Sequence, residues 1–69
     1  MLSEMDRMLL KQKAVNDVAG EHHLHMIHIL MQDSSRADRT ASYMSEAGAL
    51  AYYRGYFRYK LQKLQESSK

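Results

Sequence analysis

Apolar residues recur every three or four positions along most of the chain, which is the spacing of an amphipathic α-helix. In the first half of the sequence they share one side of a helical wheel, which we expect to face the core. This predicted core stripe is interrupted by the polar residues Gln12, Asn16 and His23. It contains Met1, Met5, Met8, Leu9, Gln12, Val15, Ala19, His23, Met26, Ile27 and Leu30.

Turn-forming residues cluster at one place, residues 32–35. Ser35 followed by Asp38 resembles a capping box, and Ser3 with Asp6 repeats the signal near the N-terminus. Two helices of nearly equal length joined by so short a turn are expected to pack antiparallel. The prediction is one all-α domain over 1–69, an antiparallel helical hairpin with a helix over about 4–32, a turn over 33–35 and a helix over about 36–65.

The second predicted helix carries more apolar surface than one neighbouring helix can cover. Small side chains form one line along it: Ala37, Ala41, Met44, Gly48, Ala51 and Gly55. Bulky side chains form another line: Tyr43, Leu50, Tyr53, Phe57, Leu61 and Leu64. Because the partner helix of the hairpin covers one line, we expect the other to pair with a second copy in a homodimeric four-helix bundle.

Composition narrows the class of protein. The 69 residues include no cysteine, which excludes a disulfide framework, a thiolate zinc site and a cysteine nucleophile. The N-terminus has no basic leader and no apolar run approaches 18 residues, so we expect a cytoplasmic protein without a membrane span. The net charge of +2 is too small by itself to indicate a nucleic-acid partner.

The densest candidate for a binding surface is the segment 51–60, where five aromatic residues alternate with cations. Tyrosine and arginine are enriched at the hot spots of protein interfaces. Aromatic and cationic side chains can also stack on bases and hold phosphates, so nucleic-acid binding is an alternative, and simple shielding of the helix is another. The predicted partner-binding residues are Tyr52, Arg54, Tyr56, Arg58, Tyr59, Lys60 and Lys63.

Three residues of the first predicted helix invite a metal-binding interpretation. Glu21, His25 and His28 project from one side of the helix, where they could ligate zinc, nickel or copper, or gain charge as the pH falls through about 6.5. Their spacing matches neither the His-Glu-x-x-His motif nor the Glu-x-x-His motif of di-iron bundles. We therefore expect no metal or cofactor, and a metal-binding or pH-responsive bundle is kept as an alternative.

No catalytic constellation is apparent either. Ser34 and Ser35 belong to the predicted turn, and the chain has no glycine-rich phosphate loop. A surface of two helices also offers little volume from which water is excluded. We expect a protein that is not an enzyme.

In length and pattern, this methionine-rich and tyrosine-rich chain resembles the small proteins with which bacteriophages take over host regulators, in particular the phage quorum-sensing anti-activators. The resemblance implies inhibition by occlusion, in which an apolar helical face covers a host protein. The implied host proteins are a LuxR-type quorum-sensing transcription factor and the type IV pilus assembly ATPase. The chain is also similar to the dimeric RNA-binding hairpins of plasmid copy control, but its broad tyrosine stripe departs from their polar, basic face.

Overall fold

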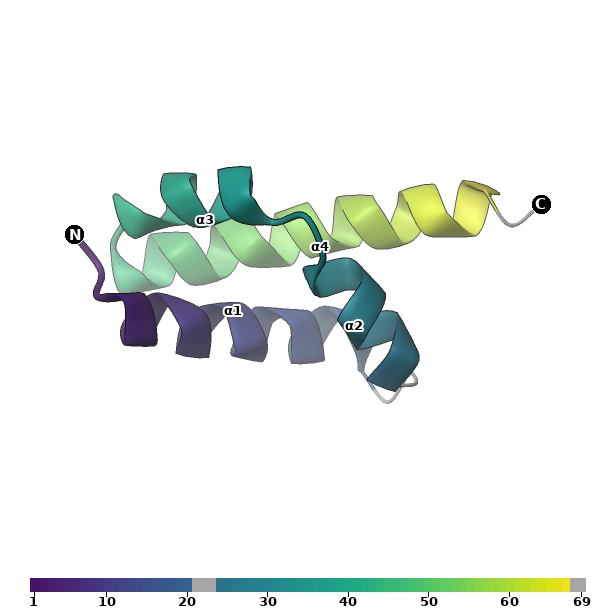
Figure 1. Cartoon of the computed structure of the whole chain (residues 1–69), viewed down its shortest axis with the longest axis horizontal. Coiled ribbons are helices and arrows are strands. Elements are labelled where there is room, and N and C mark those ends of the chain that lie inside the picture. Colours follow the sequence, from purple (N-terminus) through teal and green to yellow (C-terminus); the bar gives the residue numbers. More distant parts are fainter. Residues whose placement is uncertain (21–23, 68–69) are drawn as a thin grey trace.

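Figure 1 shows the computed structural model of the chain, which describes residues 1–20 and 24–67. The described residues form four helices and no strand: α1 (Glu4–Ala19), α2 (Leu24–Met31), α3 (Ser35–Ser42) and α4 (Glu46–Ser67). The prediction of an all-α protein is confirmed for this part of the chain. The two long helices are not found, because each of the two predicted segments is interrupted once.

The first interruption is at Gly20. The start of α1 is where the sequence indicates it, since the Ser3 hydroxyl accepts a hydrogen bond from the backbone N–H of Asp6 at 3.1 Å. At the other end Gly20 has a φ of +59°, and its N–H donates to the carbonyl of Asn16 at 2.8 Å. Residues with a side chain avoid positive φ, so this glycine ends the helix. The prediction of one helix over 4–32 was wrong for this reason.

The second interruption lies between α3 and α4. The Ser45 hydroxyl accepts a hydrogen bond from the N–H of Gly48 at 3.1 Å, and its carbonyl accepts one from Ala49 at 2.8 Å. Ser45 thus acts as the N-cap of a new helix. The prediction of one helix over 36–65 was therefore also wrong. Its start was close, since α3 begins at Ser35, after Asp33 at a φ of +55°.

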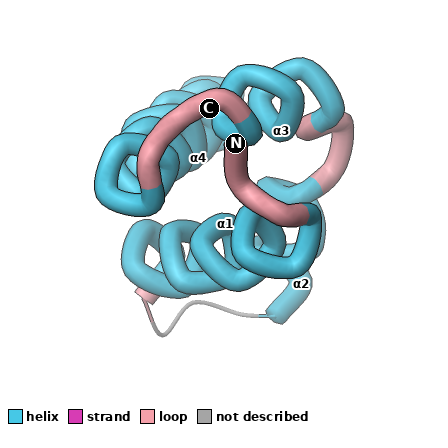
Figure 2. Tube along the Cα trace, turned by 90° about the vertical axis from the view of Figure 1, so that its left-hand side faces the viewer, coloured by secondary structure: helices cyan, strands magenta, loops and turns pink. Residues whose placement is uncertain are grey.

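These interruptions change how the helices pack. α1 and α4 lie side by side and run in the same direction, and α3 runs opposite to both along the first half of α4 (Figure 1). Seen end-on, α1, α3 and α4 surround a shared core, while α2 packs against α1 and α4 at the other end of the molecule (Figure 2). The predicted antiparallel hairpin is not what the structure shows, because the turn at 43–45 brings α4 back parallel to α1.

The core is small and rich in alanine. Tyr53 and Phe57 are its largest side chains, and their rings stack with centroids 5.8 Å apart. Small side chains let neighbouring helix axes approach closely. In the described part of the chain the buried apolar residues are Ala14, Val15, Ala19, Leu30, Ala37, Ala41, Ala49, Tyr53 and Phe57.

The predicted core stripe of the first helix is buried only in part. Met5, Met8 and Leu9 are 72%, 55% and 63% exposed. α1 instead turns another side toward its neighbours, with Lys11 buried because its ammonium reaches the carboxylate of Asp38 on α3. The buried positions of α1 are Lys11, Ala14, Val15 and Ala19.

The two lines of side chains predicted on the second helix are each buried only in part, because the helix is interrupted between α3 and α4. Ala37 and Ala41 of the small line are buried, whereas Ala51 is exposed. Phe57 of the bulky line is in the core, whereas Tyr43 is 79% exposed because it precedes the restart of the helix. Surplus apolar surface is therefore found, but mainly on α1.

Candidate protein-interaction site

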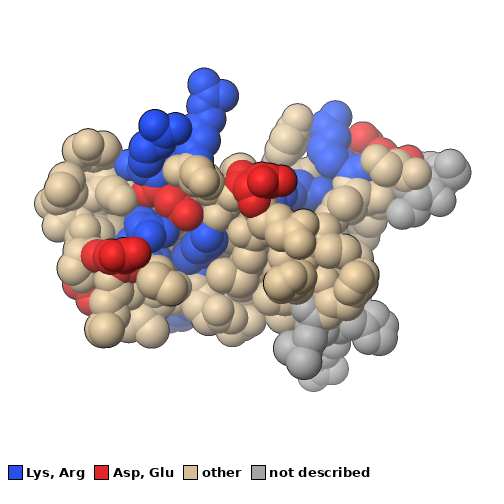
Figure 3. Space-filling view, in the orientation of Figure 1, with Lys and Arg blue, Asp and Glu red and all other residues tan. Residues whose placement is uncertain are grey.

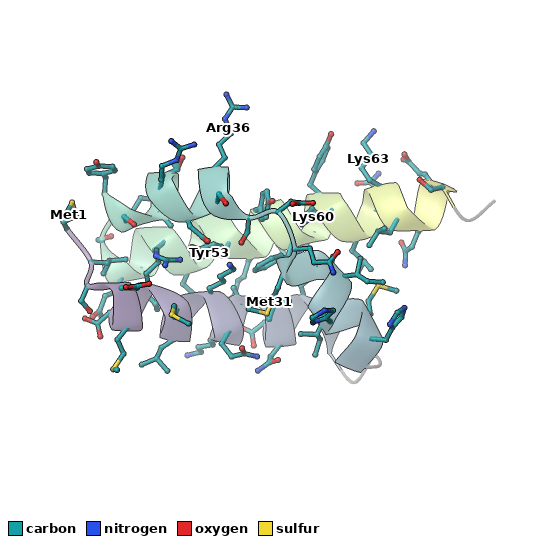
Figure 4. The ribbon with its side chains drawn as sticks, in the orientation of Figure 1. Met1, Met31, Arg36, Tyr53, Lys60 and Lys63 are labelled. Atoms are coloured by element: carbon teal, nitrogen blue, oxygen red, sulfur yellow. The ribbon has the colours of Figure 1, made fainter. Side chains whose placement is uncertain are left out.

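A cluster of polar side chains joins α1, α3 and α4 around Tyr53, which is labelled in Figure 4. The carboxylate of Asp38 accepts hydrogen bonds from the Tyr53 hydroxyl at 2.6 Å and from the Lys11 ammonium at 3.2 Å. The Ser34 hydroxyl donates to the same carboxylate at 3.2 Å and accepts from Lys11. The Arg7 guanidinium lies 3.2 Å from the other carboxylate oxygen of Asp38. Two cations therefore share one carboxylate.

The cluster moves the pKa values of Asp38 and Tyr53 away from neutrality. Burial acts to raise the pKa of Asp38, but hydrogen bonds from Tyr53 and Lys11 and the charges of Lys11 and Arg7 outweigh it, so this pKa is below its ordinary value. Burial and the hydrogen bond to Asp38 raise the pKa of Tyr53 to about 12. A general acid or base works best with a pKa near the operating pH. The cluster is thus suited to tying helices together, not to proton transfer.

Two of the predicted interface residues, Tyr56 and Lys60, bind the main chain between α2 and α3. The Lys60 ammonium donates to the carbonyls of Leu30 at 2.8 Å and Gln32 at 2.5 Å. The Tyr56 hydroxyl donates to the carbonyl of Asp33 at 3.4 Å. A cation at the C-terminal end of α2 complements the helix dipole, although burial lowers the pKa of Lys60. These bonds hold α2 against α4.

Two further predicted residues also contact other parts of the molecule. The Arg54 guanidinium donates to the carboxylate of Asp17 at 2.7 Å and 3.1 Å, which links α4 to α1. The Tyr52 ring is half-buried and nearly parallel to the ring of Tyr56, with centroids 6.5 Å apart. Four of the seven predicted residues are thus at least partly buried within the molecule, and of the three exposed ones Lys63 lies 3.7 Å from the carboxylate of Glu66 on the same helix.

The other three are exposed but do not share one surface. Tyr59 is 60% exposed, and the Lys63 ammonium lies 5.5 Å from the centre of its ring. Arg58 is exposed too, but at about 100° per residue it lies on the opposite side of α4 from Lys60 and Lys63. The structure therefore separates Arg58 from Lys60 and Lys63 and leaves it on the same side of α4 as Arg54.

Tyr59 and Lys63 instead border a shallow groove between α2 and the C-terminal half of α4. We call it the α2/α4 groove; Lys60 and Lys63 of its rim are labelled in Figure 4. Its apolar floor is formed by Ile29 and Leu64. The complete lining is Ile29, Tyr59, Lys60, Lys63, Leu64 and Ser67.

Sequence reasoning did not include Ile29 and Leu64 among the predicted partner-binding residues. Leu64 was placed in the bulky line of the second helix, and Ile29 lies in a segment that is apolar nearly all round. That all-round apolar character indicates more than one neighbour. Which neighbour Ile29 meets depends on the direction of α2, and α2 is set at an angle only because α1 ends at Gly20.

A second exposed apolar surface lies on α1, turned away from the core. Met5, Met8 and Leu9 line a shallow hollow together with Glu4 and Gln12. We call the three apolar residues the α1 face. None of the helices in the described ranges combines the length and the apolar character that crossing a membrane requires.

The proposed metal ligands are not brought together in the part that can be described. Glu21 lies outside the described residues, and His25 and His28 are exposed on α2. Within residues 1–20 and 24–67, no three His, Cys, Asp or Glu side chains are grouped closely enough to hold a metal ion.

The chain matches no protein-family model, no curated protein and no solved structure. No relative therefore links it to the phage anti-activators or to plasmid copy control. Its function has to be argued from its own surfaces, of which the α2/α4 groove and the α1 face are the most distinctive.

Proposed function

We propose that this protein is a non-enzymatic protein-binding module whose partner covers the α2/α4 groove. The observation that supports this most directly is the exposed Tyr59 ring beside an apolar floor, with the Lys63 ammonium at the rim. Aromatic anchors next to apolar side chains are typical of interface hot spots, and a cationic rim favours an acidic partner. The expected partner is a protein surface that inserts an apolar side chain between acidic residues.

The groove is held in shape before a partner arrives. Lys60 and Tyr56 bind main-chain carbonyls of residues 30–33, so α2 is fixed relative to α4. Side chains and segments that are already ordered lose less conformational entropy on binding. The sequence-predicted residues Tyr56 and Lys60 thus support the interface from within.

A more specific form of the proposal is an inhibitor or adaptor that occludes a host regulatory protein, such as a LuxR-type transcription factor or the type IV pilus ATPase. Chain length and the methionine-rich and tyrosine-rich composition support this form. Occlusion requires only that the small protein cover a surface that the host protein needs for its own function. A module of 69 residues can do this without catalysing a reaction.

The groove is tested by comparing matched variants in affinity capture from host extract and then in titrations with the purified partner. Tyr59→Ala is expected to weaken binding by about 2 kcal/mol, the cost of truncating a hot-spot residue. Its control is Tyr43→Ala, a tyrosine of comparable exposure at the other end of the molecule. Lys63→Ala is likewise compared with Arg58→Ala, on the opposite side of α4. A partner that binds the groove variants as tightly as wild type would contradict the proposal.

A nucleic-acid partner is the second candidate, because cations gather on one side of the molecule. Arg36 of α3 and Lys63 of α4 point to the same side in Figure 4, and blue side chains stand out along that side in Figure 3. Phosphate binding releases counterions, so affinity would fall steeply with salt. The affinity would also fall more in Arg36→Ala than in Tyr59→Ala. Nuclease treatment would abolish the capture of protein from extract.

A further inference from the structure

We propose that the α1 face binds the same face of a second copy of this chain, with the two α1 helices antiparallel about a twofold axis. Met5, Met8 and Leu9 are more than half exposed and line one continuous hollow. An axis passing between Met8 and Leu9 sets each Met8 against Leu9 of the other copy. Each Met5 then meets Gln12 of the other copy, so the apolar side chains cover one another.

Charges beside the face select the antiparallel arrangement. Asp6 and Lys13 are exposed on one flank of α1, seven residues apart, and neither forms an ion pair with another described residue. Antiparallel helices bring the same flank of each copy together, so Asp6 comes within about 3 Å along the axis of Lys13 of the other copy. The twofold axis repeats this contact, so the dimer contains two Asp6–Lys13 pairs. In a parallel pair this flank of each copy would lie on opposite sides of the dimer, so Asp6 and Lys13 could not meet, and the helix dipoles would align unfavourably.

The area is sufficient for a specific but modest dimer. The three apolar side chains expose on the order of 350 Å² per copy, in the range at which surface patches mark interaction sites. With Glu4, Asp6, Gln12 and Lys13 included, two copies would bury about 1,000 Å² in total, the lower limit for a specific interface. A dissociation constant in the micromolar range is the expectation.

Cysteine cross-linking tests the geometry directly, because the chain has no cysteine of its own. Leu9→Cys, next to the proposed axis, should form a disulfide-linked dimer under mild oxidation. Ala51→Cys, exposed on α4, should not. A mixture of Met5→Cys and Gln12→Cys should cross-link at least tenfold faster than Met5→Cys with itself. Faster self-linking of Met5→Cys would show a parallel pair and overturn the proposal.

Sedimentation equilibrium tests the energetics. Leu9→Glu should raise the dissociation constant of the dimer at least tenfold, and circular dichroism should show the fold unchanged because the side chain is exposed. Lys13→Glu should weaken the dimer as well, and adding Asp6→Lys should restore it. Lys63→Glu is the control, with the same charge change far from α1.

Two outcomes would overturn the dimer. One is a wild-type protein that stays monomeric to millimolar concentration, and the other is a dimer whose dissociation constant is unchanged in Leu9→Glu. Neither affects the proposed α2/α4 groove, since that surface is tested by Tyr59 and Lys63 variants. Failure of the groove would likewise leave the α1 pairing standing.

Discussion

Asp38 is the carboxylate that Arg7, Lys11 and Tyr53 share, so its replacement should be costly. Asp38→Asn leaves two partly buried cations without their counter-charge, and we expect the free energy of unfolding to fall by about 2–3 kcal/mol. Urea unfolding at neutral pH measures it. Asp17→Asn is the matched control, because its ion pair with Arg54 is exposed and should contribute less than about 1 kcal/mol. Equal losses in the two variants would contradict a special role for Asp38.

The same carboxylate predicts how stability depends on acid. The pKa of Asp38 is lowered in the folded protein, so as the pH falls the unfolded chain takes up the proton first. The contribution of Asp38 is therefore full above its unfolded pKa of about 3.9 and is lost as the pH falls through the folded value. We expect the stability difference between wild type and Asp38→Asn to shrink below about pH 4. A difference that stays constant down to the acid transition would show that Asp38 acts through shape instead of charge.

At high pH, the ionisation of Tyr53 should lower the stability of the protein. Its pKa is raised to about 12, so the folded protein keeps the phenol protonated after the unfolded chain would ionise. Its contribution to stability is full below about pH 10 and is lost as the pH rises toward the folded value. Near-ultraviolet absorbance should show one tyrosine ionising with a midpoint near 12. That component should disappear in Tyr53→Phe, and its persistence there would assign the shift to another ring.

At the scale of the elements, two glycines should respond to alanine with opposite signs. Gly20 ends α1 at a φ of +59° and a ψ of −129°, a combination that is accessible mainly to glycine, so alanine there costs about 1–3 kcal/mol even though no neighbour crowds it. Gly55 lies inside α4 with open space around it, so alanine there should stabilise the protein by up to about 1 kcal/mol. Thermal melting of both variants tests this. Stabilisation by Gly20→Ala would mean that the helix can continue through this point.

The sequence predicted where two of the four described helices start, one with a capping hydrogen bond and one without. Ser3 caps α1 as its spacing to Asp6 indicates. The start near Ser35 was found within one residue, but the predicted capping box of Ser35 and Asp38 was wrong, because the N-cap is Ser34 and its side chain makes no capping hydrogen bond. The interruptions were not found, because Gly20 and Ser45 both occur in sequences that can also continue a helix. A helical wheel drawn through Gly20 or Ser45 assumes one continuous helix. The directions that it assigns to side chains before and after the break are therefore not comparable. The wheel aligned Met5 with Leu30, although only Leu30 is buried.

The same limit applied to the candidate site. Spacing alone grouped Tyr56 and Tyr59, which do lie on the same helix, but it does not show that Tyr56 binds the carbonyl of Asp33 while Tyr59 remains exposed. That difference depends on where α2 ends. Lys11 gave no signal of burial, since a lysine is expected to face water and this one is held inside by a charge on another helix.

For the molecule as a whole, the small core limits how stable one copy can be. Apart from alanines, the fully buried side chains among the residues that the structure describes are Tyr53, Phe57, Leu30 and Val15. A single core in a chain of this length rarely supplies more than about 3–5 kcal/mol. Pairing through the α1 face would add to this by mass action, because a second copy binds the folded chain and not the unfolded one.

The melting temperature of the wild type should therefore depend on protein concentration. Each tenfold increase across the dissociation constant adds about 0.7 kcal/mol per copy, which for a domain of this size raises the melting temperature by about 3–5 °C. Leu9→Glu should melt at the same temperature throughout, close to the dilute wild type. Tyr59→Ala should keep the wild-type slope, since its ring lies in the α2/α4 groove. A wild-type melting temperature that is independent of concentration would mean that the four helices are stable alone, with the α1 face open to water.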